Sequence, residues 1–323
     1  MKSINLLYLI LLSIINQTYQ AQYTNPVIPR DAPDPTVIKA DNGHYYLYAT
    51  GEGIYKSSNL IQWTYVRNVF QGKPRPSFVK VNSYWAPCIT KQGKQYILYY
   101  ALSVWGGIDT AGIGVATSSS PEGPFDIKGD GRLFTSKEIG VRNSIDPYFL
   151  IDNKKKYLVW GSFHGIYAVE LDNSGLKVKN PKGKFQLAGR AFEAPYIYKR
   201  GQYYYLFASI GSCCEGDNSK YQTVVGRSKN FRGPYLNKNG GKMLENRYTV
   251  LLSGNKKFVG PGHNSRIVTD KKGKTWMFYH AYVRGQSKNG RTVCLDEVKW
   301  TKDGWPYFDG NGPSTQQKSG PIL

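Results

Sequence analysis

Residues 143–163 read NSIDPYFLIDNKKKYLVWGSF, and this stretch decides the fold. It joins an Asp-Pro pair, a short apolar run, a polar turn and an aromatic-rich segment. Similar units occur elsewhere, each with a short apolar segment before a turn rich in Gly or Lys and an aromatic strand after it. The aromatic strands begin at Tyr46, Tyr96, Tyr157, Tyr204 and Trp276. The chain therefore contains five copies of one strand–turn–strand unit.

The repeat predicts the fold class. Self-similarity at a period of about 40 to 50 residues indicates a propeller or a solenoid. The repeated segments are short and rich in Tyr, Val, Ile and Phe, as strands are, and helical periodicity is scarce after the N-terminus. We therefore predict an all-β chain that forms a five-bladed β-propeller in a single domain over residues 22–323.

The propeller geometry predicts a site on its axis. Residues at equivalent places before the second strand of each blade should meet at one end of the channel. The residues 11 to 13 positions before the aromatic anchors are Asp34, Trp85, Asp146, Glu193 and His263. The alternative is that the acids are corner residues, since Asp before Pro is a common turn element. That alternative covers the two Asp residues individually but not the glutamate.

The N-terminus has the pattern of a targeting segment. Lys2 is followed by an apolar run from about Leu6 to Ile15, which is too short to span a bilayer, and then by polar residues. We predict a signal peptide over residues 1–21, with cleavage near Ala21, and we weigh a buried N-terminal helix as the alternative. The mature protein is expected to be secreted or periplasmic, without a membrane partner.

The net charge of +21 is spread over turns rather than gathered in one arm. An excess of positive charge can promote binding to nucleic acid, to an anionic surface or to an anionic polymer, or it can simply keep the protein surface solvated. Export argues against nucleic acid as a partner.

The four cysteines do not form a disulfide scaffold. Cys213 and Cys214 are adjacent, and adjacent cysteines rarely bridge because the intervening peptide must distort. Their spacing also fits no zinc motif. We therefore expect buried or loop-packing thiols, with Cys88 and Cys294 in the same class.

Three converging carboxylates suit glycoside hydrolysis. Two carboxyl groups that flank the scissile bond are the minimum, one protonated as the acid and one ionised as the base. A third carboxylate nearby raises the pKa of the acid by like-charge repulsion. Trp85, Trp105 and Phe163 would suit stacking on sugar rings, although strand packing remains the alternative for each of them.

A set of motifs carries a family resemblance. The ordered motifs are DAPDPTVI, YWAPCI, NSIDPYF with LVWGSFHGI, EAPYIYKRGQYYYLFAS, GSCCEG, VGRSKNFRGPY and GPGHNS. Together they resemble glycoside hydrolase family 43, and within it the arabinan endo-1,5-α-L-arabinanases, over nearly the whole mature chain. The resemblance implies a five-bladed propeller and inverting, single-displacement hydrolysis.

The resemblance also implies roles for individual residues. Asp34 matches the general base, Glu193 the general acid, and Asp146 the residue that raises the pKa of the acid and orients it. His263 matches a histidine that faces a hydrated metal ion, usually Ca²⁺, although the residues alone would equally allow a packed histidine. Positions near the sugar-binding cleft are matched by Trp85, Asn143, Ser162 and Phe163.

Two residues depart from the family pattern. Cys88 follows Trp-Ala-Pro where an acid is common, so a substrate contact or a structural hydrogen bond is expected to be lost. Asn237 stands where Asp is frequent, at a position that looks peripheral. Neither change touches the three acids, so we expect activity to survive with the subsite preference open.

The resulting interpretation is an exported, endo-acting hydrolase of α-1,5-L-arabinofuranosidic bonds in arabinan, a side chain of pectin. It needs no organic cofactor, and a monomer is expected because a closed propeller needs no partner. The basic surface could hold the enzyme on the anionic pectin backbone. The alternatives are an exo-acting arabinofuranosidase, a xylan-active relative and a non-catalytic glycan-binding propeller.

Overall fold

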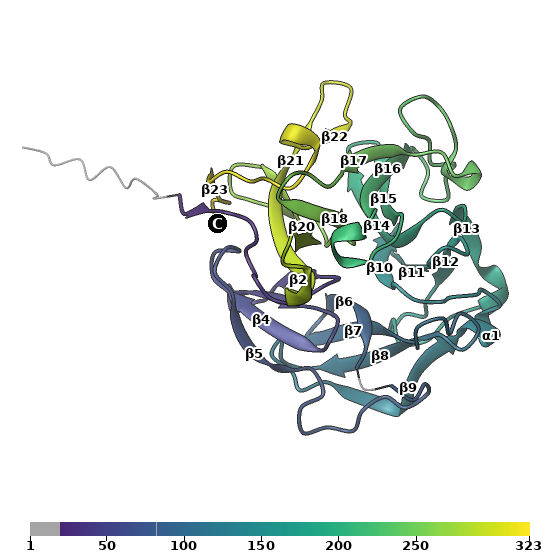
Figure 1. Cartoon of the computed structure of the whole chain (residues 1–323). Coiled ribbons are helices and arrows are strands. Elements are labelled where there is room, and N and C mark those ends of the chain that lie inside the picture. Colours follow the sequence, from purple (N-terminus) through teal and green to yellow (C-terminus); the bar gives the residue numbers. More distant parts are fainter. Residues whose placement is uncertain (1–19, 82) are drawn as a thin grey trace, which may run out of the picture.

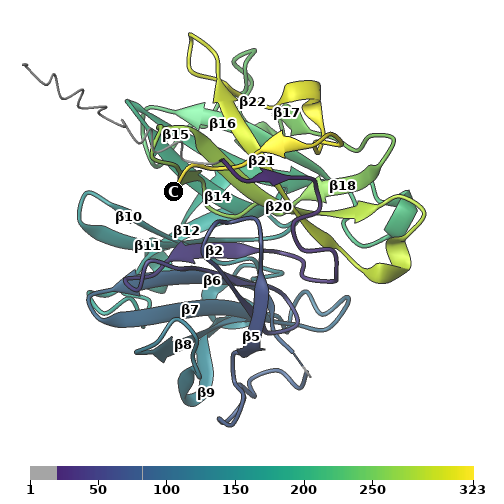
Figure 2. The same ribbon diagram turned by 90° about the vertical axis from the view of Figure 1, so that its left-hand side faces the viewer.

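The computed structural model describes residues 20–81 and 83–323, and these form five β-sheets arranged as blades around an axis and one two-stranded sheet of the terminal segments (Figure 1). The first strand of each blade lies nearest the centre of the ring in Figure 1. The view in Figure 2 shows the blades from the side. The predicted all-β, five-bladed propeller is confirmed. The predicted signal peptide lies almost wholly outside the described residues.

Each blade takes its strands from one continuous segment. Blade 1 holds β2 (Thr36–Lys39), β3 (Tyr45–Tyr48), β4 (Gly53–Ser57) and β5 (Thr64–Asn68). Blade 2 holds β6 (Trp85–Gln92), β7 (Gln95–Leu102), β8 (Gly112–Ser118) and β9 (Asp126–Thr135). Blade 3 holds β10 (Tyr148–Asp152), β11 (Lys155–Trp160), β12 (Ile166–Glu170) and β13 (Phe185–Ala188).

Blade 4 holds β14 (Glu193–Arg200), β15 (Tyr203–Ile210), β16 (Gln222–Ser228) and β17 (Thr249–Leu252). Blade 5 holds β18 (Phe258–Gly262), β20 (Thr275–Val283), β21 (Thr292–Trp300) and β22 (Pro306–Tyr307), with β19 (Val268–Thr269) paired to β20. Helical structure is brief: α1 (Ser136–Ile139), η1 (Pro181–Gly183), η2 (Gly216–Asn218), η3 (Met243–Glu245), η4 (Ser287–Asn289) and η5 (Asp309–Asn311).

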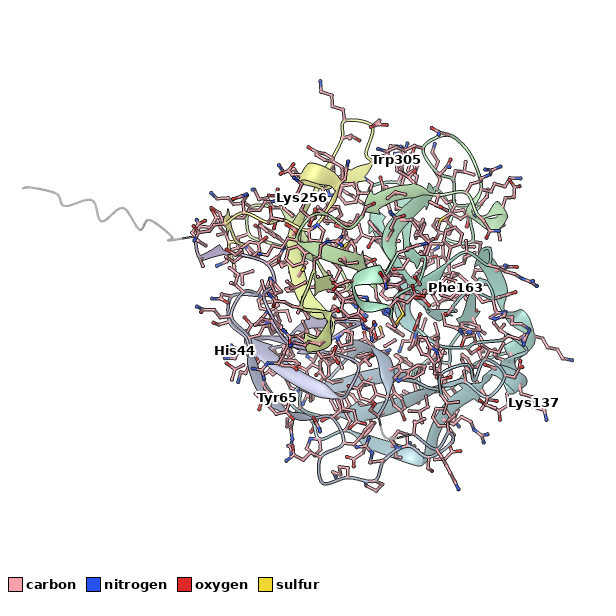
Figure 3. The ribbon with its side chains drawn as sticks, in the orientation of Figure 1. His44, Tyr65, Lys137, Phe163, Lys256 and Trp305 are labelled. Atoms are coloured by element: carbon pink, nitrogen blue, oxygen red, sulfur yellow. A yellow bond between two sulfur atoms is a disulfide. The ribbon has the colours of Figure 1, made fainter. Side chains whose placement is uncertain are left out.

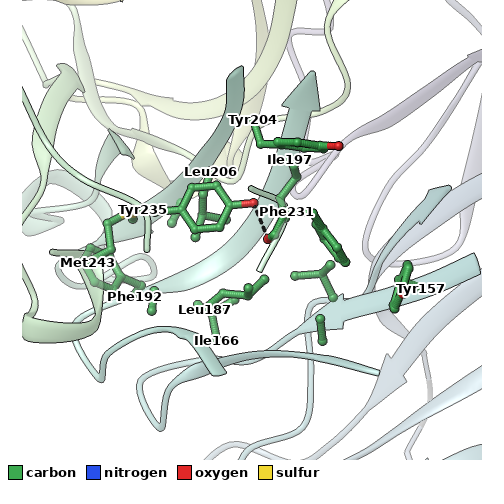
Figure 4. Close-up of a cluster of buried hydrophobic side chains, with 14 of the residues drawn as sticks. Tyr157, Ile166, Leu187, Phe192, Ile197, Tyr204, Leu206, Phe231, Tyr235 and Met243 are labelled. Atoms are coloured by element: carbon green, nitrogen blue, oxygen red, sulfur yellow. Dashed lines mark hydrogen bonds between the residues drawn. The ribbon is translucent and has the colours of Figure 1, made fainter. Parts of the chain in front are cut away.

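The core is divided among the blade interfaces. Consecutive residues of a strand point to opposite faces of the sheet. In β15, Tyr205 therefore packs between blades 4 and 5, while Leu206 packs between blades 3 and 4. Figure 4 shows the interface of blades 3 and 4, where the hydroxyl of Tyr235 donates to the carbonyl of Phe231 at 2.9 Å. Because both faces of these strands are buried, they read as continuous apolar runs rather than alternating ones.

The ring is closed by the two terminal segments. Strand β1 (Gln22–Tyr23) pairs with β23 (Lys318–Ser319), antiparallel. Beside this pair, the side chain of Asn25 donates to the carbonyl of Leu295 at 3.2 Å and accepts from its N–H at 2.9 Å. The N-terminal segment is thereby fixed to β21 of blade 5. Within the described residues, no helix is long and apolar enough to cross a membrane.

Strand register corrects the predicted repeat positions. The pairs that correspond in blades 1 to 4 are Thr36–Tyr48, Cys88–Tyr99, Tyr148–Val159 and Tyr196–Phe207. In each blade, one residue lies two positions before the first-strand member of this pair. These residues are Asp34, Ala86, Asp146 and Ala194, and all have positive φ between 45° and 58°. His263 has the same left-handed backbone in blade 5, with φ 47°. Trp85 and Glu193 therefore precede the repeat position by one residue.

The same displacement affects the aromatic anchors. In the register above, Ile97 and Tyr205 correspond to Tyr46, so the predicted anchors Tyr96 and Tyr204 are each one residue early. The error arises because these strands are aromatic or apolar on both faces, so an aromatic residue does not mark one face. For this reason, the predicted alignment of blades 2 and 4 with the other blades was wrong by one residue.

The expectation for the adjacent cysteines is also wrong. Cys213 and Cys214 form a disulfide, with their Cα atoms 3.8 Å apart, the spacing of an ordinary trans peptide. The loop around the pair supplies hydrogen bonds that hold it: the hydroxyl of Ser219 donates to the carbonyls of Ser212 at 2.6 Å and Cys213 at 3.3 Å. Cys88 and Cys294 are buried free thiols, as expected.

Candidate active site

The predicted site residues meet in one cleft of about 570 Å³. All eight line it: Asp34, Trp85, Asn143, Asp146, Ser162, Phe163, Glu193 and His263. Phe163 (labelled in Figure 3) is 36% exposed, and Trp105, which also lines the cleft, is 80% exposed. Aromatic surface at the edge and buried carboxylates within are the arrangement expected of a sugar-binding cleft.

Asp34 lies among cationic groups. Its Oδ1 is 3.1 Å from Nη1 of Arg291 and 3.2 Å from Nδ1 of His263. The hydroxyl of Thr50 donates to Oδ2 at 2.6 Å. Burial alone would raise the pKa of this carboxyl, but Arg291 and His263 hold that pKa well below its usual range. Asp34 is therefore ionised at neutral pH.

Two neutral groups fix the position of Asp34. The backbone N–H of Asp34 donates to Nδ1 of His280 at 3.2 Å, and burial with nearby Arg291 lowers the pKa of His280 to about 4. Thr50 also accepts from the backbone N–H of Ala86 at 2.8 Å. Asp34 is thus tied to blade 5 through its backbone N–H and His280, and to blade 2 through its carboxylate and Thr50.

Asp146 and Glu193 lie in a different environment. Burial raises the pKa of Asp146 to about 8; His263 opposes this rise, and the carboxyl groups of Glu193 and Asp34 add to it. Burial also raises the pKa of Glu193, against the lowering effect of hydrogen bonds from Tyr221 and Ser162. The two groups interact, so they titrate as a pair that keeps a proton at neutral pH.

Hydrogen bonds across blades 3 and 4 hold this pair. The hydroxyl of Ser162 donates to Oε2 of Glu193 at 2.7 Å, and the two residues form a β-bridge. Asn143 donates to the carbonyl of Ser162 at 3.2 Å. The backbone N–H of Ala194 donates to Oδ2 of Asp146 at 3.1 Å. Asn143 and Ser162, predicted as sugar contacts, thus also position the glutamate.

His263 interacts with both Asp34 and the Asp146–Glu193 pair. Burial would lower its pKa, but the carboxyl groups of Asp34, Asp146 and Glu193 raise it to about 8. A protonated His263 at neutral pH stabilises the ionised form of Asp34. The cleft therefore contains one carboxylate that can accept a proton and a carboxyl pair that can give one.

The site has a limited capacity for a metal ion. Nδ1 of His263 faces Asp34, which leaves Nε2 as its available donor. No group of three or more His, Cys, Asp or Glu residues in the described part of the chain is placed to hold a metal. Ca²⁺ takes six to eight oxygen ligands, so an ion at His263 would fit only if it kept most of its water.

Four residues whose side chains interact with the acids were missed by sequence reasoning: Thr50, Tyr221, His280 and Arg291. Tyr221 directly precedes β16, and Arg291 directly precedes β21. Both strands are the third of their blades, so a comparison of the residues before third strands would have found these two. His280 lies inside an apolar strand and carries no such signal.

The two departures from the family pattern lie away from the cleft lining. The thiol of Cys88 is buried; it accepts from the N–H of Phe149 at 3.3 Å and lies 3.8 Å from Nη2 of Arg266. Asn237 closes a turn by accepting from the N–H groups of Asn239 and Gly241. Neither side chain lines the cleft.

A larger hollow, of about 730 Å³, lies at the outer strands of blades 2 and 3. Its lining includes Asp126, Arg132, Glu138 and Asp172, each exposed or half-buried on the outside of the ring. It contains none of the predicted site residues, so the chemistry belongs to the smaller cleft on the axis.

Comparison with known proteins supports the same family. The sequence profile of glycosyl hydrolases family 43 matches residues 23–306. The chain belongs to this family. As a family 43 member it is a glycoside hydrolase, and its five-bladed propeller is the fold of its arabinanase neighbours.

The relatives of this family 43 chain include two curated extracellular enzymes. It is 33% identical over 308 residues to the extracellular exo-α-(1→5)-L-arabinofuranosidase ArbA of Cellvibrio japonicus, covering 86% of each chain. It is 34% identical over 294 residues to the extracellular endo-α-(1→5)-L-arabinanase 1 of Bacillus subtilis, covering 85% of this chain and 87% of the relative.

Solved structures agree with the family assignment. The α-L-arabinanase of Cellvibrio cellulosa in complex with arabinohexaose superposes with a TM-score of 0.78 at 31% identity, covering 86% of this chain and 95% of the other. The similarity extends over nearly the whole propeller and so includes the strands that carry the cleft.

Proposed function

We propose that this chain is an exported, endo-acting arabinanase that hydrolyses α-1,5-L-arabinofuranosidic bonds by inverting single displacement. The observation that carries the proposal is the split of the three buried carboxyl groups into an ionised Asp34 and a proton-retaining Asp146–Glu193 pair within one cleft. Relatives named as arabinanases and an arabinohexaose complex supply the substrate class.

In the proposed mechanism, Asp34 accepts a proton from the attacking water as that water bonds to the anomeric carbon. Glu193 gives its proton to the leaving oxygen on the other side of the bond. Inversion needs the two carboxyl groups roughly 6.5–9.5 Å apart, so that the water fits between base and sugar. Asp146 and Glu193 share one proton at neutral pH, and an ionised Asp146 raises the pKa of Glu193 by like-charge repulsion.

The rest of the lining binds the polymer. Trp85, Phe163 and the exposed Trp105 offer ring faces for arabinose units, and Asn143 lies where it can contact a sugar hydroxyl. The net charge of +21 favours adsorption to the anionic backbone of pectin, from which arabinan branches. Such adsorption would weaken with salt.

A hydrated divalent cation, Ca²⁺ by preference, is proposed to contact Nε2 of His263, and binding would require that nitrogen to give up its proton. When bound, the cation would add positive charge near the three acids and help to keep Asp34 ionised. Metal analysis of the purified protein, with melting temperatures before and after EDTA, tests this proposal. The proposal would be contradicted if the purified protein contained no metal and its melting temperature did not change with EDTA or with added Ca²⁺.

The first experiment is a time course on linear arabinan with products separated by size. An endo-acting enzyme releases a ladder of oligosaccharides early. The second candidate is exo action, which the similarity to ArbA favours and which releases a single short product from the start. Absence of any product from arabinan, with xylan as the parallel substrate, would overturn the proposed specificity.

A further inference from the structure

The loop over residues 211–221, between β15 and β16, reaches the catalytic cleft. Ser212, Cys213, Cys214 and Glu215 line the cleft together with the three acids, and the same loop ends at Tyr221. Both cysteines are half-buried. The loop therefore combines a disulfide on the cleft wall with a tyrosine that enters the core of the site.

Tyr221 is 1% exposed and contacts both halves of the site. Its hydroxyl lies close enough to Glu193 to lower the pKa of that carboxyl group against the effect of burial, and burial and the carboxyl group raise the pKa of Tyr221 in turn. Its ring is stacked on His280, with ring centres 5.5 Å apart and planes within 8°. His280 in turn accepts from the backbone N–H of Asp34 at 3.2 Å. One side chain thus links the proposed acid to the support of the proposed base.

Two glycines leave the space that this arrangement needs. A Cβ at Gly262 would lie 2.3 Å from Cδ1 of Tyr221, and a Cβ at Gly260 would lie 2.4 Å from the hydroxyl oxygen of Ser219. Neither distance is possible for packed atoms, so a side chain at either position would displace the loop. Strand β18 is thus shaped to admit Tyr221 and its neighbour.

The loop is held at its outer end as well. The carboxylate of Asp217 accepts from the backbone N–H of Gly285 at 3.0 Å, which ties the loop to blade 5. Within the loop, the backbone N–H of Lys220 donates to the carbonyl of Ser212 at 3.2 Å, next to the Ser219 hydrogen bonds. These contacts join the disulfide to the residue that directly precedes Tyr221.

We propose that Tyr221 is a positioning residue for Glu193 and that the Cys213–Cys214 loop holds it there. The inference rests on the proposed role of Glu193 as the general acid. Tyr221 fixes the direction of the carboxyl group toward the leaving oxygen through its hydroxyl. The disulfide restricts the loop, so that the ring stays between Glu193 and His280.

The test compares Tyr221→Phe with wild type on aryl arabino-oligosaccharides whose leaving phenols span a wide range of pKa. Hydrolysis of poor leaving groups needs the acid, whereas good leaving groups depart without protonation. We expect kcat to fall roughly 10- to 100-fold on arabinan and on poor leaving groups, with KM within about twofold, and little loss on the best leaving group.

Tyr235→Phe is the matched control. Tyr235 is also 1% exposed, and its hydroxyl donates to a backbone carbonyl between blades 3 and 4. Its loss is expected to lower the melting temperature without any dependence on the leaving group. Equal losses on every leaving group in Tyr221→Phe, or no loss on arabinan, would overturn the proposal.

The Cys213→Ser/Cys214→Ser double variant tests the loop and does not disturb the buried core. We expect the same dependence on the leaving group as in Tyr221→Phe, and little further loss when the three changes are combined, because they act through one contact. Losses that multiply in the triple variant would contradict a shared action. An inactive wild type would instead overturn the proposed function, and the role of Tyr221 with it.

Discussion

The two walls of the cleft shift the pKa values of their carboxyl groups in opposite directions. On the wall made by blades 1 and 5, Asp34 has the guanidinium of Arg291 and the imidazole of His263 within 3.2 Å. On the wall made by blades 3 and 4, Glu193 receives hydrogen bonds from the neutral hydroxyls of Ser162 and Tyr221. Cations hold the pKa of the first group down, whereas burial outweighs the neutral donors and raises the pKa of the second.

The comparison teaches how one set of acids can divide into a base and an acid. Both walls bury their carboxyl groups to a similar degree: Asp34 is 6% exposed and Glu193 is 7% exposed. Burial alone would therefore raise both pKa values alike. The difference comes from which charges the neighbouring blade supplies, and so the walls can be altered separately.

The largest expected effect comes from removing the reacting groups. Asp34→Asn and Glu193→Gln should each lower kcat on arabinan by about 10²–10⁴-fold, because each deletes one proton transfer. On an aryl substrate with a good leaving group, only Asp34→Asn should remain severely impaired. Steady-state kinetics on both substrates measures this, with circular dichroism to verify folding. Near-normal turnover in either variant on arabinan would remove that residue from its role.

An intermediate effect is expected from removing the cation of the first wall. Arg291→Met should raise the pKa of Asp34, so the acidic limb of the profile of kcat/KM against pH should move to higher pH. The loss should be about tenfold or more at pH 5 and smaller at pH 7, since Asp34 must be ionised to act. Arg291→Lys keeps the charge and is the control. An acidic limb that stays in place in Arg291→Met would show that the other neighbours of Asp34 suffice.

The smallest effects concern the alkaline limb, which follows the proton on the second wall. With the pKa of Asp146 at about 8, activity should decline as the pH rises through that value and the pair loses its proton. Asp146→Asn removes a neighbouring carboxyl group and should move this limb to lower pH. Ser162→Ala removes a donor to Glu193 and should move it slightly to higher pH, with a few-fold change in kcat, for a hydrogen bond worth about 1 kcal/mol. Shifts of the same sign in both variants would contradict this division.

Much of this arrangement could be predicted from the sequence because it repeats. The five strand–turn–strand units gave the propeller, and the residues before their second strands gave the acids. The left-handed backbone shared by Asp34, Asp146 and His263 explains why that alignment worked in blades 1, 3 and 5. In blades 2 and 4 alanine takes the left-handed position, and the functional side chain precedes it.

The remaining site residues could not be predicted because their roles depend on contacts between blades. His280 is one apolar-strand residue among many until Asp34, 246 residues away, donates to it. The disulfide was missed for a related reason. The cysteine pair was judged as an isolated dipeptide, whereas the hydrogen bonds of Ser219 hold the surrounding loop in shape.

The closure of the ring by β1 and β23 has a consequence for protein engineering. The backbone N–H of Gly320 donates to the carbonyl of Ala21 at 2.8 Å, so the two ends of the folded chain lie side by side. A short linker between them, with new termini at the exposed Gly201 turn between β14 and β15, would convert the closure into a covalent join. Such a circular permutant should keep every blade and could carry a fused domain on blade 4.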